Sequence, residues 1–114
     1  MAQTKQGRWV TDADESTSSA LKLVTETLVG FYTPAALDAA KLKFQASHDG
    51  ENFVDIVSEG SALTVDVDVD QYIALDATKF LGPAHVRVVH LDSGGDAVDE
   101  SAERVLLPIF RTFE

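Results

Sequence analysis

The chain has no cysteine, three prolines and one tryptophan among its 114 residues. Without thiols it can form neither a disulfide framework nor a thiolate metal site such as a zinc ribbon. No apolar run approaches the roughly 18 residues of a membrane-spanning helix, and the N-terminal MAQTKQGRWV lacks the hydrophobic segment of a signal peptide. We therefore expect a soluble protein, made in the cytoplasm, that folds around its core without covalent cross-links.

Basic residues are also scarce. The chain carries 9 Lys and Arg against 19 Asp and Glu, which gives a formal net charge of -10. This excess of negative charge opposes attraction to nucleic acid phosphates and to anionic membrane surfaces. The expected partners are proteins or uncharged ligands, with no nucleic acid and no membrane among them.

Apolar residues alternate with polar ones along most of the chain, which is the period of a half-buried β-strand. The expected strands cover residues 21–32, 41–47, 52–57, 63–75, 85–91 and 103–113. Turn residues separate them, and almost no helical periodicity is present. The pattern predicts a single all-β domain over residues 21–114, an antiparallel β-sandwich or a jelly-roll-like small barrel.

The first twenty residues have a different composition. Residues 11–19, TDADESTSS, are polar and acidic without apolar periodicity, so residues 1–20 are expected to form a flexible acidic arm. Trp9 is the exception in this arm. It is either incidental or, together with Arg8, an anchor that docks when the arm orders on a partner.

The C-terminal strand, RVLLPIFRTFE, is apolar on both faces. Such a strand is central in a sandwich, or it is an edge that a partner covers. Pro108 cannot donate to a ladder and favours the edge. Phe110, Arg111 and Phe113 are then candidate partner-binding residues. The acidic loop over residues 92–100 is expected to face solvent or to touch a neighbour.

Ser47, His48 and Asp49 invite a catalytic interpretation, but a nucleophile, base and acid usually meet from separated parts of a chain. Asp-Gly at residues 49–50 is a strong hairpin signal. We therefore predict a turn, with the flanking Phe44 and Phe53 entering the core.

No other motif indicates chemistry. Asp66, Asp68 and Asp70 alternate like calcium ligands, but the glycine and the glutamate that a calcium loop requires are absent. The three histidines are dispersed, and there is no phosphate loop or nucleophile elbow. We predict no catalytic, cofactor-binding or metal-binding residues, and no enzyme activity.

Five segments in order resemble a family of small structural proteins of tailed bacteriophages. They are GFYTPAA (30–36), LKFQASHDGENF (42–53), YIALD (72–76), KFLGPAHVRV (79–88) and PIFR (108–111) with the preceding Arg104. The resemblance covers residues 24–111 and does not include the N-terminal residues.

The resemblance implies a virion component, similar to the capsid decoration or cement proteins. Such a protein would bind the major capsid protein and neighbouring copies of itself on the capsid surface, as a homo-oligomer that stabilises the head after synthesis in the host cytoplasm. A tail or connector subunit is an alternative. Another is a carbohydrate-binding or host-surface adhesion module, for which Trp9, Tyr32 and Tyr72 would be the exposed aromatic residues.

Overall fold

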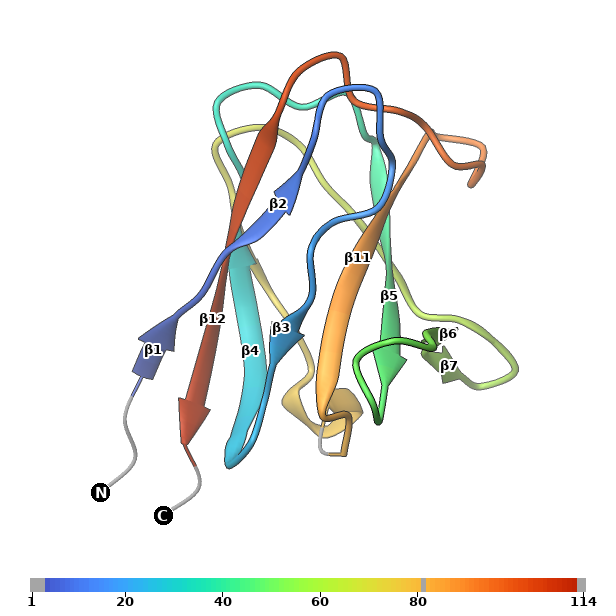
Figure 1. Ribbon diagram of the computed structural model, residues 1–114. Helices are drawn as coiled ribbons and strands as arrows, with labels where there is room; N and C mark the ends of the chain where they lie inside the picture. Colours follow the sequence, from blue (N-terminus) through green and yellow to red (C-terminus); the bar gives the residue numbers. More distant parts are fainter. Residues whose placement is uncertain (1–3, 81, 113–114) are drawn as a thin grey trace.

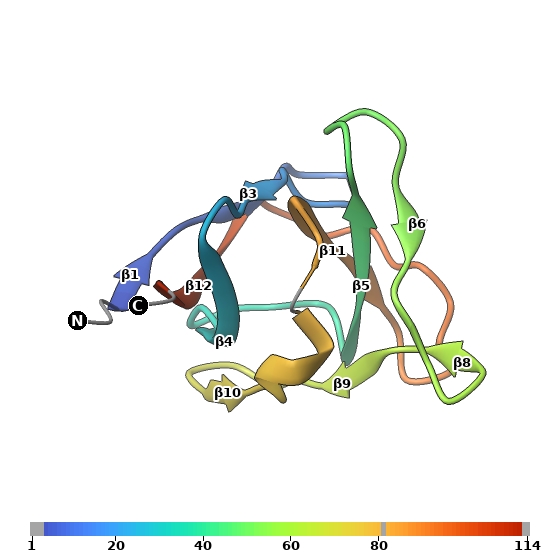
Figure 2. The same cartoon turned by 90° about the horizontal axis from the view of Figure 1, so that it is seen from below.

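The computed structural model describes residues 4–80 and 82–112, which form two β-sheets packed face to face (Figures 1 and 2). The first sheet contains β1 (Thr4–Gln6), β2 (Trp9–Thr11), β12 (Arg104–Thr112), β4 (Glu26–Tyr32) and β10 (Tyr72–Ala74). The second contains β3 (Leu21–Lys22), β11 (His85–Leu91), β5 (Lys41–Ser47), β6 (Val54–Asp55) and β9 (Thr64–Asp66). A small hairpin of β7 (Val57–Ser58) and β8 (Ser61–Ala62), and the 3-10 helix η1 (Ala77–Phe80), complete the described elements.

Every strand pair is antiparallel. In the first sheet the order is β1, β12, β4 and β10, with β2 on the same side of β12 as β1. In the second the order is β3, β11, β5 and β6, with β9 beside β6. No described residue lies in an α-helix. The prediction of an antiparallel all-β sandwich is confirmed.

Four aromatic side chains occupy the middle of the core. Ring centroids lie 5.9 Å apart between Trp9 and Phe31, 6.2 Å between Phe31 and Phe44, and 5.2 Å between Phe44 and Phe80. These contacts are edge-to-face, a geometry that adds about 0.5–1.5 kcal/mol per pair to the burial of apolar area. The rings come from both sheets and from η1, so they hold the two layers together.

The N-terminal segment belongs to the sandwich, which corrects the expectation of a separate flexible arm for residues 4–20. β1 and β2 pair with β12, and Trp9 is fully buried. The Trp9 indole Nε1 donates to the carbonyl of Val86 in the second sheet, at 3.0 Å. Farther along, Thr17 bridges to Val89. The segment thus passes from the first sheet to the second and closes one side of the sandwich (Figure 1).

β12 is an interior strand, which corrects its expected place at a sheet edge. It pairs with β4 on one side and with β1 and β2 on the other. The carbonyl of Pro108 accepts from the backbone N–H of Gly7 at 2.9 Å. In an extended strand the nitrogen and the carbonyl of one residue point the same way. The backbone nitrogen of Pro108, which has no hydrogen to donate, therefore also lies on the side of Gly7. β1 and β2 are interrupted at this point, which is how the sheet accommodates the proline.

The strand expected over residues 63–75 is divided between the two sheets. β9 pairs with β5, whereas β10 pairs with β4. The chain crosses between them at residues 67–71, where Asp70 has a φ of 54°. The alternation of apolar and polar residues continues through the crossing because both parts border the same core. For that reason the pattern alone did not reveal the break.

Trp9→Ala tests whether the N-terminal segment is part of the core. We expect a loss of about 3–5 kcal/mol in the free energy of unfolding, the range for truncating a buried aromatic side chain, measured by urea denaturation. Arg8→Ala, at the exposed neighbouring position, serves as the control and should change it by less than about 0.5 kcal/mol. Equal stability of Trp9→Ala and the unsubstituted protein would mean that the segment is a detached arm.

Candidate functional site

The residues Ser47, His48 and Asp49 form a turn, as predicted. The Ser47 hydroxyl donates to Asp49 Oδ1 at 2.8 Å and accepts from the Gly50 amide at 2.9 Å. Gly50 has a φ of 81°, which glycine adopts without strain. The backbone N–H of Asn52 and further local donors hold the pKa of the Asp49 carboxyl far below its usual range. Both polar groups are used by the turn itself, and no hydrogen bond joins either one to His48.

The two phenylalanines around this turn have different environments. Phe44 is fully buried in the core, as predicted. Phe53 is not part of the core, which corrects that expectation. The Arg87 guanidinium lies 4.0 Å from its ring centroid, on the outer face of the second sheet. Phe53 directly precedes β6, and the pairing of Val54 with Ala46 turns it outward.

A cavity of about 350 Å³ lies beside the turn. Its walls include Ala46, Val54, Pro83 and Ala84, and His48 is the titratable residue in its lining. The Ser47 hydroxyl, also in the lining, is engaged in the turn. The cavity therefore offers no activated nucleophile with its base.

The described residues likewise form no cluster of metal ligands. Among residues 4–80 and 82–112, no three His, Asp or Glu side chains are grouped so that they could hold a metal ion. Asp66, Asp68 and Asp70 are exposed where the chain leaves β9 and crosses to β10.

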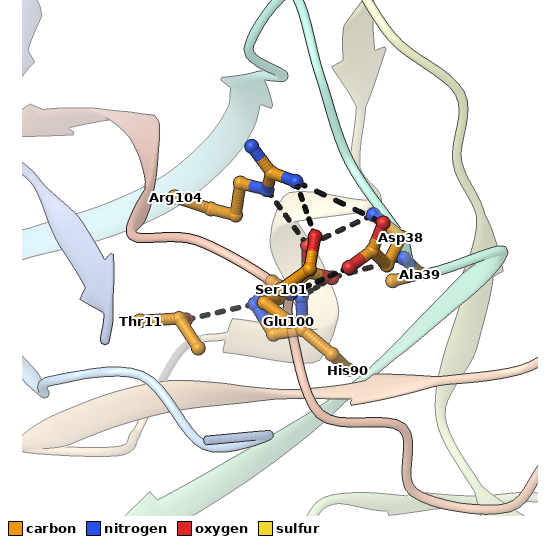
Figure 3. A network of polar contacts seen from close by, with 7 residues as sticks. All are labelled: Thr11, Asp38, Ala39, His90, Glu100, Ser101 and Arg104. Carbon is orange, nitrogen blue, oxygen red and sulfur yellow. Dashed lines mark hydrogen bonds and ion pairs between the residues drawn. The ribbon is translucent and has the colours of Figure 1, made fainter. Parts of the chain in front are cut away.

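The most elaborate polar arrangement surrounds Glu100, which is fully buried (Figure 3). Its Oε1 accepts from the Asp38 amide at 2.8 Å and from Arg104 Nε at 2.9 Å. Its Oε2 accepts from the Ala39 amide at 2.9 Å and from His90 Nδ1 at 2.8 Å. Both carboxylate oxygens are thus saturated by four donors. Sequence reasoning placed Glu100 in a solvent-facing loop, which was wrong.

This network extends to the N-terminal segment through His90. A carboxylate only accepts hydrogen bonds, so the imidazole Nδ1 carries a proton. In the neutral ring, Nε2 then accepts from the Thr11 hydroxyl, 2.8 Å away. Thr11, His90 and Glu100 have the order of nucleophile, base and orienting acid. All three are fully buried, so no substrate reaches the hydroxyl. The arrangement is structural, joining β2, β11 and the loops on either side of them.

The protonation states follow from burial and from the donors. Burial lowers the pKa of the His90 imidazole more strongly than Glu100 raises it, so the ring is neutral at neutral pH. Burial alone would raise the pKa of Glu100, but the Asp38 amide, Arg104 and His90 outweigh it and the pKa is lowered. A neutral histidine beside an ionised glutamate fits the proton positions inferred from the hydrogen bonds.

The outer face of the first sheet is the second notable feature. Tyr32 and Tyr72 are paired across β4 and β10, with ring centroids 4.8 Å apart, and are 47% and 45% exposed. The Tyr72 ring covers Gly30, where a Cβ atom would collide with it. Glycine at this position therefore lets an aromatic ring lie across the neighbouring strand.

Apolar and basic side chains continue this surface. Leu106 and Phe110 point into the core, so alternation turns Leu107 and Ile109 outward, where they are half-buried. The tyrosine face, as we call it, consists of Arg8, Tyr32, Tyr72, Leu107, Ile109 and Arg111.

The five predicted partner-binding residues divide into three groups. Trp9 and Phe110 are buried at 0% and 8% exposure and cannot serve as surface anchors, which corrects their expected role. Arg8 and Arg111 are exposed and both belong to the tyrosine face. Phe113 lies outside the described residues.

The sequence predicts Arg8 in a flexible N-terminal arm and Arg111 in a strand at the edge of a sheet, so it gives no indication that the two residues share a surface. The structure brings them to one face because β1 and β2 flank β12.

Comparisons with protein-family models, with curated proteins and with solved structures find no match to this chain. Within the described part of the chain, no helix has the length and apolar character needed to cross a membrane.

Glu100→Gln tests the structural role of the buried network. The side-chain amide of glutamine would place an NH2 group against the donors that Glu100 accepts from, and the ion pair with Arg104 would be lost. We therefore expect a loss of about 3–5 kcal/mol in the free energy of unfolding, as for breaking a buried ion pair. Glu103→Gln, at an exposed position three residues away, is the matched control and should be neutral. Urea denaturation measures both. A neutral effect of Glu100→Gln would show that the network does not stabilise the fold.

Acidification should destabilise the protein in two stages. In the folded protein the pKa lies below the ordinary value of 6.5 for His90 and of 4.5 for Glu100. As the pH falls, each group is therefore protonated at a higher pH in the unfolded chain than in the folded protein. The free energy of unfolding should be highest above pH 6.5, fall as His90 of the unfolded chain is protonated, and fall further below pH 4.5. Urea denaturation at a series of pH values measures this. A rise in stability between pH 7 and pH 5 would instead mean that the folded protein protonates His90.

Proposed function

We propose that this chain is a non-enzymatic structural protein of a tailed-bacteriophage virion. In this proposal it is a decoration protein that binds the major capsid protein and stabilises the head, and the tyrosine face is its attachment surface. The observation that carries the proposal is the composition of that face. In a chain with 19 acidic residues, the five strands of the first sheet contain one, Glu26, which is ion-paired with Lys5 at 3.3 Å.

The chemistry of the face suits a protein partner. Tyrosine and arginine are enriched at the centres of protein interfaces, whereas acidic residues are depleted there. Leu107 and Ile109 supply apolar area between the tyrosine pair and Arg111. The face lies on paired strands with an aromatic core behind it, so binding needs little ordering of the backbone.

A decoration role also agrees with the general properties of the chain. A subunit that contacts neighbouring capsomers gains from avidity over the lattice, so each contact can be weak. The remaining acidic surface would face outward and keep particles from associating. The motifs over residues 24–111 that resemble phage structural proteins support the same role. The same surface would equally serve a tail or connector subunit, which differs in the virion protein that it meets.

The tyrosine pair favours carbohydrate binding as a second candidate function. Exposed aromatic rings stack on the apolar faces of sugars, and Tyr32 and Tyr72 lie side by side. Trp9, the third aromatic residue considered for this role, is buried. The cavity described above lies beside the 47–50 turn and not beside the tyrosines.

Co-sedimentation with expanded capsids that lack the protein tests the decoration role. We expect saturable binding at a fixed ratio to the major capsid protein. Replacing both Tyr32 and Tyr72 by Ser should weaken binding at least about tenfold, the effect of losing a central interface side chain. Val54→Ser with Val57→Ser removes two other exposed apolar side chains and is the control, as is His48→Ala at the turn. Both controls should bind normally.

Absence of binding by the unsubstituted protein would contradict the decoration role. Tyrosine-dependent binding to glycans in its place would establish the second candidate. Normal capsid binding by the tyrosine variant, or loss of binding in His48→Ala with folding unchanged, would contradict the assignment of the attachment surface.

A further inference from the structure

Arg8 belongs to a row of side chains that crosses the first sheet. β1 and β2 keep one register against β12, because Gln6 pairs with Ile109 and Trp9 pairs with Leu106. The same register places Arg8 opposite Leu107. Leu107 pairs with Tyr32, which pairs with Tyr72. Since neighbouring strands are about 4.8 Å apart, the backbone of Arg8 lies about 10 Å from that of Tyr32.

The backbone on both sides of Arg8 is anchored in the core. Trp9 is fully buried, and a Cβ atom at Gly7 would lie 2.6 Å from Leu21 Cδ1 and 3.2 Å from Phe110 Cε1. Gly7 and Trp9 therefore face inward, and Arg8 between them faces outward. The backbone of Arg8 therefore has a defined position, from which the side chain extends on the tyrosine face.

Neither Arg8 nor Arg111 has an ionic partner within residues 4–80 and 82–112. The ion pairs there are made by Lys5, Lys43 and Arg104. Two unpaired guanidinium groups thus border an apolar surface in a protein whose net charge is -10. Retaining both cations on this face is useful if the partner supplies the opposite charge.

We infer that the tyrosine face binds an acidic protein surface, with partner carboxylates pairing with Arg8 and Arg111 around an apolar centre. This inference rests on the proposed function and specifies its partner. A planar guanidinium binds a carboxylate through two parallel hydrogen bonds, so the pairing would also fix orientation.

The same charges oppose a twofold contact of the face with itself. A twofold contact of the face with itself would bring arginines together without any carboxylate from the first-sheet strands other than the paired Glu26. A twofold contact between neighbouring copies on a capsid would therefore use other surfaces.

Charge reversal with a matched control tests the inference. Arg8→Glu with Arg111→Glu is compared with Lys22→Glu with Lys79→Glu, two exposed lysines outside the first sheet. Each double variant lowers the net charge by the same four units, so only the position differs. In co-sedimentation with expanded capsids, we expect the arginine variant to bind at least about a hundredfold more weakly, from about tenfold or more per charge pair. The lysine variant should change less than about threefold. Circular dichroism and urea denaturation confirm folding of both.

The outcomes separate the inference from the proposed function. Equal weakening of both variants would show that only total charge matters and would overturn the inference. Normal binding by the arginine variant, together with loss of binding by the tyrosine variant, would overturn it while leaving the decoration role intact. Failure of the unsubstituted protein to bind capsids would overturn the decoration role and, with it, the inference. Binding of the unsubstituted protein that increases with salt would also contradict a carboxylate partner.

Discussion

The buried carboxylate of Glu100 is the interaction on which one end of the sandwich depends. Its four donors come from the loop at residues 38–39, from β11 and from the start of β12, and His90 extends the contact to Thr11 in β2. The carboxylate thus joins β11 and the start of β12 to the loop at residues 38–39, about sixty residues earlier in the chain. An ionised group in the interior is tolerated because Arg104 and the oriented amides replace its hydration. β2 is therefore fixed at both ends, by Trp9 in the aromatic core and by Thr11 in this network.

The positions of β1 and β2 beside β12 also determine which side chains share the outer surface of the first sheet. Because β1 and β2 complete the first sheet, Arg8 joins the outward row that contains Leu107 and the two tyrosines. The inner side of the same strands carries Trp9, Leu106 and other core residues. Alternate residues of these strands point to opposite sides of the sheet, so one half of them lines the core and the other half forms the proposed attachment surface. On β12, Leu106 and Phe110 face the core, whereas Leu107 and Ile109 lie half-buried on the outer face, so the strand is apolar on both faces.

Much of the fold follows from local pattern, since alternation identifies most strands and Asp49 with Gly50 identifies the turn. The misplaced features share a nonlocal cause. Trp9 is an isolated apolar residue in a polar segment, so the segment shows no alternation of apolar and polar residues. The sequence therefore does not reveal that Trp9 packs against aromatic rings from distant parts of the chain. Glu100 is one of several acids in a loop, and its burial depends on donors from elsewhere in the chain. For the surface, Arg8 and Arg111 were identified individually, but their common face follows from strand pairing that composition does not encode.

A cryo-electron microscopy reconstruction of expanded capsids saturated with the protein would show which sheet of the sandwich meets the shell. We expect the first sheet to face the capsid protein, with Tyr32 and Tyr72 within the contact and capsid carboxylates beside Arg8 and Arg111. The second sheet should face away from this contact. Attachment through the second sheet or through the turn at residues 47–50, with the tyrosine face open to solvent, would contradict the proposed attachment surface.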